Sequence, residues 1–134
     1  ELSTLGNRIK ILSSKSGLSA FSDTELERTL RDAGIVDIII CGALTSACVD
    51  STGRAAHERG FRVHIPSDCV AARSALDLQH FTESVYPLYA TSVRPAEELA
   101  KCMMAGRGPR LLSRLTPTRS PRRKAQFLSD ASRQ

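Results

Sequence analysis

One stretch of the sequence, residues 36–49, joins an apolar run to a glycine turn and then to a cysteine. Residues 36–41 are apolar apart from Asp37, and Gly42 follows at the end of the run. A run rich in β-branched residues is typical of a parallel strand that is covered on both faces. Cys48 comes six residues after Gly42, where a helix of small residues is predicted to begin. A strand, a tight turn and a helix N-terminus that carries a thiol are a common way to build a reactive cysteine.

The rest of the chain alternates between predicted strands and predicted helices. Strands are predicted at residues 8–13, 36–41, 61–66 and 90–93. Helices are predicted at residues 24–33, from Ser46 to about Gly60, at about 77–89 and at 96–104. The second of these would place Val49, Thr52 and Ala56 on one side, where small residues let it lie close to the sheet. The first helix follows a capping-box pattern over residues 22–25, and Gly34 provides a left-handed stop. This alternation predicts an α/β fold, with a parallel sheet and helices packed on its faces.

The charge of the chain is divided between a mildly acidic body and a basic tail. Residues 1–100 hold ten Lys or Arg and thirteen Asp or Glu, a net charge of −3, whereas residues 101–134 have a net charge of +8. We therefore expect one domain over residues 1–105 and a basic disordered tail over residues 106–134. The tail has a single aromatic residue, Phe127, and so no stacking platform. We do not expect a nucleic-acid partner.

The cysteines and histidines show no spacing typical of a metal site. Cys41, Cys48, Cys69 and Cys102 form no CxxC pair, which argues against zinc and against a disulfide framework. We expect a cytoplasmic protein with no metal and no cofactor. No run approaches the roughly 20 apolar residues of a membrane helix, so we expect no membrane partner. The chain begins with Glu1 rather than Met, which favours a missing or removed upstream part.

Two predicted loops should meet at one edge of the sheet. Lys15 follows the carboxyl end of the first predicted strand, and Cys48 follows the carboxyl end of the second. Ligands bind outside the carboxyl ends of the strands in open parallel sheets. An ammonium group and a helix N-terminus both favour a thiolate. The alternative, non-catalytic interpretations are that Cys48 is a small buried core residue and that Lys15 is a solvated loop lysine.

Residues 15–21 read Lys-Ser-Gly-Leu-Ser-Ala-Phe, and residues 41–49 read Cys-Gly-Ala-Leu-Thr-Ser-Ala-Cys-Val. These segments resemble the K-x-x-x-S-A-F loop and the G-x-x-T-x-x-C-V segment of the isochorismatase-like cysteine hydrolases. The similarity continues through residues 55–63 and 68–71, and covers roughly residues 1–99. It implies a three-layer α/β/α, Rossmann-like fold, which would be incomplete at its N-terminal side. It also implies a homo-oligomer and a small-molecule amide substrate of the nicotinamide, carbamoyl or ureido type.

The resemblance also assigns roles to individual residues. Cys48 would be the nucleophile that forms a covalent thioester, and Lys15 would stabilise its thiolate. A cis peptide between Ala43 and Leu44 would direct backbone N–H groups to the oxyanion. Phe21 and Thr45 would line the substrate pocket, although Phe21 could simply pack and Thr45 could simply cap the following helix.

The acidic member of the implied Asp-Lys-Cys triad has no counterpart in these residues. In the family it ends a strand upstream of the matched region. Asp23 has the pattern of a helix start and Asp37 that of a strand start, so neither is a substitute. Two hypotheses remain: a cysteine amidohydrolase represented by part of its chain, or a catalytically inactive truncated α/β remnant with a structural or assembly role.

Overall fold

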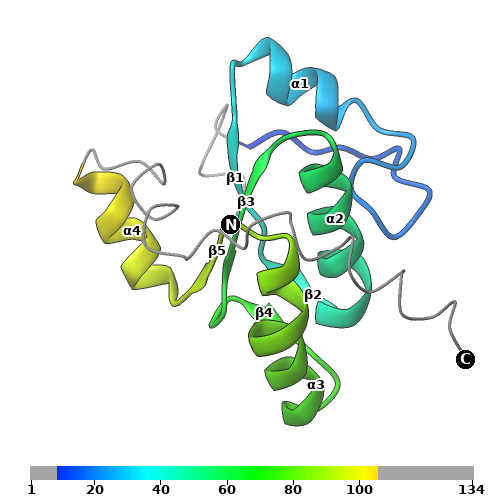
Figure 1. The fold of residues 1–134 in the computed structure, drawn as a ribbon. Coiled ribbons are helices and arrows are strands. Elements are labelled where there is room, and N and C mark those ends of the chain that lie inside the picture. Colours follow the sequence, from blue (N-terminus) through cyan, green and yellow to red (C-terminus); the bar gives the residue numbers. More distant parts are fainter. Residues whose placement is uncertain (1–8, 106–134) are drawn as a thin grey trace, which may run out of the picture.

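Two small parallel sheets flanked by helices make up the fold in the computed structural model, which describes residues 9–105 (Figure 1). The helices are α1 (Leu26–Asp32), α2 (Asp50–Glu58), α3 (Ala75–His80) and α4 (Ala96–Met104), with short π or 3-10 turns η2 (Thr45–Val49), η3 (Phe81–Val85) and η4 (Tyr86–Leu88). The strands are β1 (Asp37–Ile39), β2 (Gly42–Ala43), β3 (Arg62–Pro66), β4 (Val70–Ala71) and β5 (Ser92–Arg94). The expected α/β fold with parallel strands and flanking helices is therefore confirmed. The predicted tail, residues 106–134, lies outside the described residues.

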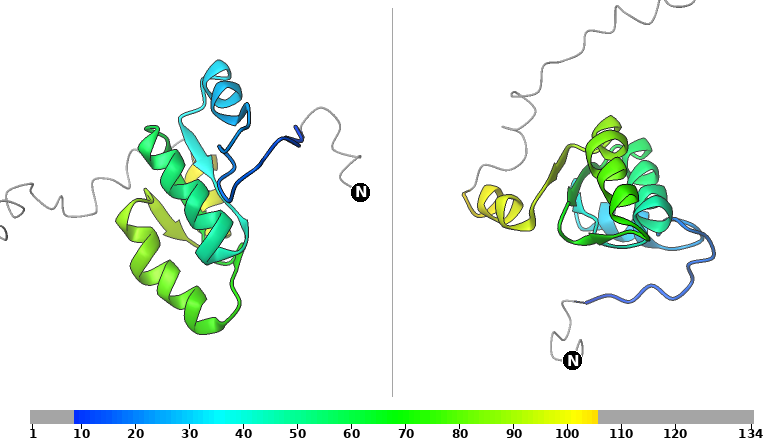
Figure 2. Two further views of the ribbon diagram at one scale, coloured as in Figure 1. Left: turned by 90° about the vertical axis from the view of Figure 1, so that its right-hand side faces the viewer. Right: turned by 90° about the horizontal axis from the view of Figure 1, so that it is seen from below.

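The central strand β3 forms the middle of the molecule. The larger sheet has the order β1-β3-β5, and the smaller one pairs β2 with β4. α2 and α3 lie on one side of the larger sheet and α4 lies beyond the other (Figures 1 and 2). Val63 and Ile65 of β3 are fully buried and belong to the main core cluster. None of the helices within residues 9–105 combines the length and apolar character that crossing a bilayer demands.

Small residues let α2 approach the core closely. Thr52, Gly53 and Ala56 are buried on α2. Ala56 lies four residues after Thr52 and three after Gly53, so the three share one helix face. A methyl group on Gly53 would lie 2.7 Å from the Cε2 and hydroxyl oxygen of Tyr89. The face predicted from the sequence, which included Thr52 and Ala56, is therefore the one that packs.

The other face of the sheet carries a row of hydrogen-bonded polar groups. Two N–H groups of Arg62 donate to the two carboxylate oxygens of Asp37. His64 is buried and lies between Asp37, at 3.1 Å from Nε2, and the Ser92 hydroxyl, at 2.8 Å from Nδ1. The row therefore crosses β1, β3 and β5 and ties the strands together through their side chains.

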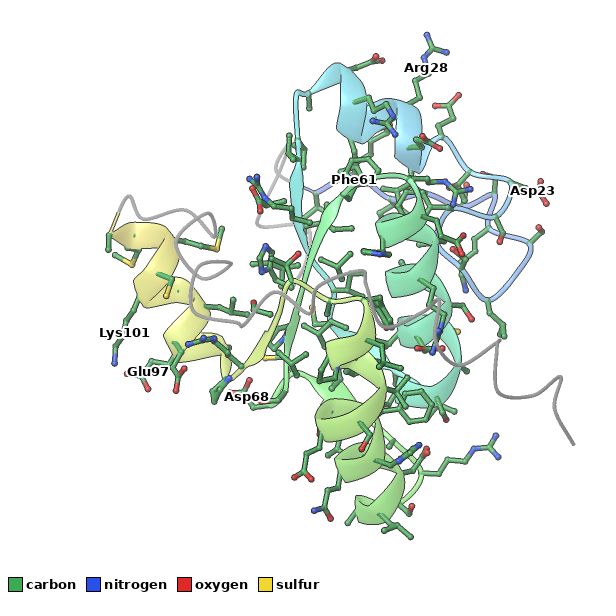
Figure 3. The ribbon with its side chains drawn as sticks, in the orientation of Figure 1. Asp23, Arg28, Phe61, Asp68, Glu97 and Lys101 are labelled. Carbon is green, nitrogen blue, oxygen red and sulfur yellow. The ribbon has the colours of Figure 1, made fainter. Side chains whose placement is uncertain are left out.

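A carboxylate fixes the start of α4. The backbone N–H of Ala96 donates to Oδ1 of Asp68 at 2.8 Å, and Asp68 lies beside the first turn of α4 in Figure 3. Glu97 and Lys101 form an ion pair one turn apart on the exposed side of the same helix. The predicted helix over residues 96–104 is present with those bounds.

The first predicted strand is absent. Residues 9–13 have no strand pairing, and the side chain of Lys10 instead donates to the Thr29 hydroxyl at 2.9 Å. An alternating pattern alone cannot make a strand, because its N–H and C=O groups need a neighbouring strand to pair with. Within the described part of the chain, no strand supplies that pairing.

The prediction that residues 36–41 are covered on both faces is also wrong. β1 is an edge strand, and Ile39 is 45% exposed. The expected capping box is not formed either, since α1 begins at Leu26 and the Glu25 N-cap has no side-chain cap bond. The Thr24 hydroxyl accepts from the Leu26 N–H at 3.3 Å instead. Gly34 does adopt the predicted left-handed conformation, with φ of +66°.

We predict that Gly53→Ala lowers stability even though alanine is the better helix former. The propensity gain is about 1 kcal/mol, whereas overpacking a core position costs about 1–3 kcal/mol. Urea unfolding would measure the net loss. In a Tyr89→Leu background the obstruction is relieved and the same change should be neutral or stabilising. A stabilising effect with Tyr89 intact would contradict the close packing of α2.

The carboxylate of Asp37 should make stability depend on pH. The Arg62 guanidinium, with a further contribution from His64, holds the pKa of Asp37 below its usual range, although burial opposes this. A lowered folded-state pKa stabilises the protein above the unfolded value of about 4 and is lost as the pH falls through the folded value. We expect Asp37→Asn to cost about 1–2 kcal/mol at pH 7, and the gap from wild type to narrow as the pH falls below the unfolded value of about 4 and through the folded value. Denaturant unfolding over this pH range measures the gap; a constant gap would contradict the prediction.

Candidate active site

The turn that carries Cys48 lies between β2 and α2. The peptide bond between Ala43 and Leu44 is cis, in the place that the resemblance implied. Residues Thr45–Val49 then form a single π-helical turn, and the N–H of Asp50 donates to the carbonyl five residues earlier. Single π turns frequently occur at functional sites. The thiol is therefore held on a widened turn at the start of a helix.

Lys15 lies beside this thiol. Its Nζ is 3.9 Å from Sγ of Cys48, although the two residues are 33 positions apart in the sequence. Lys15 is exposed and Cys48 is partly buried. The two loops thus meet as predicted, although the strand expected before Lys15 is absent. The contact places an ammonium group beside the sulfur.

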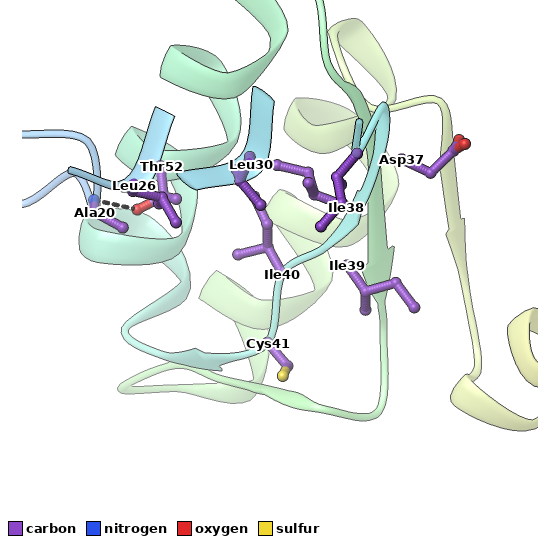
Figure 4. A pocket seen from close by; sticks show the side chains of 10 residues that line it. Ala20, Leu26, Leu30, Asp37, Ile38, Ile39, Ile40, Cys41 and Thr52 are labelled. Atoms are coloured by element: carbon purple, nitrogen blue, oxygen red, sulfur yellow. Dashed lines mark hydrogen bonds between the residues drawn. The ribbon is translucent and has the colours of Figure 1, made fainter. Parts of the chain in front are cut away.

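The lysine loop is fastened to α2 by its backbone. The N–H of Ala20 donates to the Thr52 hydroxyl at 2.9 Å, the dashed contact in Figure 4. The carbonyl of Ala20 accepts from the Thr24 hydroxyl at 2.6 Å. Within the loop, the Ser16 hydroxyl donates to Asp23. Thr52 lies one turn after Cys48, so one helix positions both the thiol and the loop that brings the lysine.

Phe21 and Thr45 are both buried. Phe21 stacks on Phe61 with 6.0 Å between ring centroids. The guanidinium carbon of Arg59 lies 5.0 Å from the centroid of the Phe21 ring. Thr45 has no exposed surface. A packing role for Phe21 is therefore visible, whereas contact of either residue with a substrate stays a prediction.

An apolar groove of about 450 Å³ lies between α1, β1 and α2. Leu26, Leu30, Ile38 and Ile40 line it together with six other residues, as Figure 4 shows. Neither Lys15 nor Cys48 is among the lining residues. The groove follows β1 and reaches the Ala20–Thr52 contact that holds the lysine loop.

The two aspartates considered in the sequence are engaged elsewhere. Asp37 binds Arg62 and His64 at the start of β1, and Asp23 accepts from Ser16. Cys48 lies beyond the opposite, carboxyl end of β1. Among residues 9–105, no group of three or more His, Cys, Asp or Glu side chains could hold a metal ion.

Sequence reasoning missed the positioning role of Thr52. It was expected on the packed face of α2, and a hydroxyl on an apolar helix face is the signal that could have indicated a partner. The contact with Ala20 could not be foreseen, because residues 15–25 follow turns rather than a regular element.

The sequence of this chain is similar to a family of known proteins. The family model of the isochorismatase domain matches residues 8–97. The chain belongs to the isochorismatase family. An uncharacterized family protein, YecD of Escherichia coli O157:H7, is 39% identical over 84 residues, which cover 63% of this chain and 44% of YecD. Nicotinamidase 3 of Arabidopsis thaliana is 37% identical over 57 residues, 42% of this chain and 29% of that protein.

A solved structure extends the family likeness to the fold. The cysteine hydrolase from Pseudomonas syringae pv. phaseolicola 1448A superposes with a TM-score of 0.63 at 25% identity, covering 68% of this chain and 47% of that one. The chain therefore spans less than half the length of these family members.

Removing the Thr52 hydroxyl should loosen the lysine loop. We expect Thr52→Val to cost about 1 kcal/mol and to speed amide exchange at Ala20, because this N–H loses its acceptor. Hydrogen exchange measured by NMR at residues 15–24 would detect the change. Thr82→Val is the matched control, since the Thr82 hydroxyl only donates to carbonyls of its own helical segment. Unchanged exchange at Ala20 would show that the loop is held by other contacts.

Proposed function

We propose that this chain carries the nucleophile and the lysine of a cysteine amidohydrolase that cleaves a C–N amide bond of a small molecule. The observation that supports it is the 3.9 Å separation between Lys15 Nζ and Cys48 Sγ at a helix N-terminus. The nicotinamidase among the relatives supports an amide substrate. The substrate would be a small amide of the nicotinamide, carbamoyl or ureido type.

The chemistry proceeds in two steps. The Cys48 thiolate attacks the carbonyl carbon, so that an S–C bond forms and the oxygen gains the negative charge. Backbone N–H groups around Leu44 and Cys48 would stabilise this oxyanion. The C–N bond then breaks as the nitrogen takes a proton from an acid. Water finally attacks the thioester, which releases the carboxylic acid and returns the thiol.

Neither of the two aspartates considered in the sequence can serve as the proton donor in this arrangement. Asp23 and Asp37 are both bonded elsewhere, so we infer that the acid comes from polypeptide outside these residues. The short share of the relatives that this chain covers is consistent with that source. The unpaired edge of β1, with Ile39 half exposed, offers a place where further strands or a second copy of the chain could pair. A homo-oligomer would use the same edge.

Alkylation of Cys48 tests whether the thiol is activated. Iodoacetamide labelling followed by peptide-resolved mass spectrometry gives the rate at each cysteine as a function of pH. We expect Cys48 at pH 7 to react faster than the exposed Cys41 and Cys69, and Lys15→Ala to slow it about five- to tenfold. Lys10→Ala is the matched control, because Lys10 is another exposed lysine that contacts Thr29 instead. Equal rates in wild type and Lys15→Ala would reject the activated nucleophile.

Turnover of a small amide distinguishes an active amidohydrolase from a catalytically inactive α/β remnant. Release of ammonia from nicotinamide that disappears in Cys48→Ala supports the amidohydrolase. Because the proposed acid lies outside residues 9–105, the assay needs protein that includes it. An activated Cys48 with no turnover of nicotinamide, carbamoyl or ureido amides in that protein would favour the inactive α/β remnant.

A further inference from the structure

Three side-chain contacts connect residues 75–89 with the turn that carries Cys48 and with Asp50, which follows that turn. Asp77 accepts from the Ser46 hydroxyl at 3.0 Å. The Tyr86 hydroxyl donates to the carbonyl of Thr45 at 3.0 Å, and the Tyr89 hydroxyl donates to Asp50 at 3.2 Å. These contacts are formed from the side of α2 on which α3 lies (Figure 1).

Tyr86 differs from the other two because it is completely buried and binds the backbone of the π turn itself. Its exposed fraction is 0%, and its ring lies edge-to-face against Phe81 and Tyr89, with centroids 5.7 and 6.1 Å away. Burial raises the pKa of Tyr86 to about 12, so the hydroxyl keeps its proton and remains a donor through the neutral pH range. These packing contacts hold the Tyr86 ring in place independently of its hydrogen bond.

The carbonyl of Thr45 is the point at which the turn is held. It accepts the i→i−5 bond from the Asp50 N–H and also the Tyr86 hydroxyl, so both of its lone pairs are used. The Thr45 hydroxyl is buried and has no hydrogen-bond partner among the described residues. The carbonyl, rather than the side chain, therefore provides the polar anchor of this residue.

We propose that Tyr86 is a positioning residue that holds the π turn so that Cys48 faces Lys15. The proposal rests on the proposed function only in taking Cys48 as the reactive thiol. Without the hydroxyl, the buried Thr45 carbonyl keeps a single partner and the turn can change toward the tighter i→i−4 pattern of an α-helix. A π turn is wider than an α turn, so this change rotates Cys48 about the helix axis and moves its sulfur relative to the lysine nitrogen.

The other two contacts are weaker anchors for the thiol. The Ser46–Asp77 contact is exposed to solvent, where such bonds contribute little. Tyr89 binds the carboxylate of Asp50, which follows the turn, and leaves the turn's backbone untouched. Tyr89 thus provides a control of the same chemistry, at a neighbouring buried position of the same segment.

The test compares Tyr86→Phe with Tyr89→Phe by peptide-resolved alkylation of Cys48 across pH, together with thermal unfolding. Each variant loses one buried hydroxyl, so we expect similar, modest decreases in the unfolding midpoint. We expect Tyr86→Phe to slow Cys48 alkylation at pH 7 about tenfold and to move the midpoint of its pH profile upward, while Tyr89→Phe stays within twofold of wild type. Equal effects of the two variants, or an unchanged rate in Tyr86→Phe, would overturn the proposal.

A donor-retaining replacement separates hydrogen bonding from packing. 4-Aminophenylalanine at position 86 keeps the ring and an N–H donor, and we expect it to keep the Cys48 rate within threefold of wild type. A rate as low as that of Tyr86→Phe would mean that the hydroxyl does not act as a donor to Thr45. This variant also serves as the test if Tyr86→Phe fails to fold.

Lys15→Ala distinguishes failure of this inference from failure of the proposed function. If Tyr86 acts by placing the sulfur near Lys15, its effect should shrink in the Lys15→Ala background, because the partner is already absent. A slowed Lys15→Ala with an unchanged Tyr86→Phe rejects the inference and keeps the function. An unchanged Lys15→Ala with a slowed Tyr86→Phe rejects the lysine's role in the function, whereas Tyr86 still sets the exposure of the thiol.

Discussion

The packing of α2 against the central strand is the interaction on which the rest of the structure depends. Val63 and Ile65 are fully buried beneath the small-residue face of this helix. The same helix begins two residues after Cys48, and its Thr52 hydroxyl accepts a hydrogen bond from the loop of Lys15. A shift of α2 would therefore displace the thiol and the lysine loop together. The contact between α2 and β3 therefore determines both the packing of the core and the geometry of the site.

The site is well organised on one side and open on the other. Tyr86 donates a hydrogen bond to the turn, Asp77 accepts one from it, and Thr52 accepts one from the lysine loop. The far edge of β1 has an exposed Ile39 and borders an apolar groove. This asymmetry agrees with a chain that covers less than half of its relatives. An α/β sheet whose β1 edge has no partner among residues 9–105 can keep part of a site in place, because helices and crossovers, rather than sheet size, fix the loops at the carboxyl edge.

Most of the fold and the meeting of the two loops followed from the sequence. Residues 61–66 and 96–104 were predictable because their periodicity is local and their neighbours lie within the chain. The approach of Lys15 to Cys48 was also predicted, although one of the two strands from which it was argued is absent. The prediction of a strand at residues 8–13 failed because a strand needs a neighbouring strand to pair with, which an alternating pattern does not reveal. The roles of Tyr86 and of the polar row were not predictable, since they depend on side chains that meet only after the sheet and helices have assembled.

The polar row on the sheet has a consequence for how the strands find one another. Side chains alternate between the two faces, so a slip of β1 by one residue against β3 would turn Asp37 toward α2 and Ile38 away from it. The slipped pairing would bury a carboxylate among Val63 and its neighbours without Arg62 or His64 to receive it, which is costly. The row therefore discriminates between alternative alignments of a very short strand, for which three residues of backbone pairing would otherwise give weak selection.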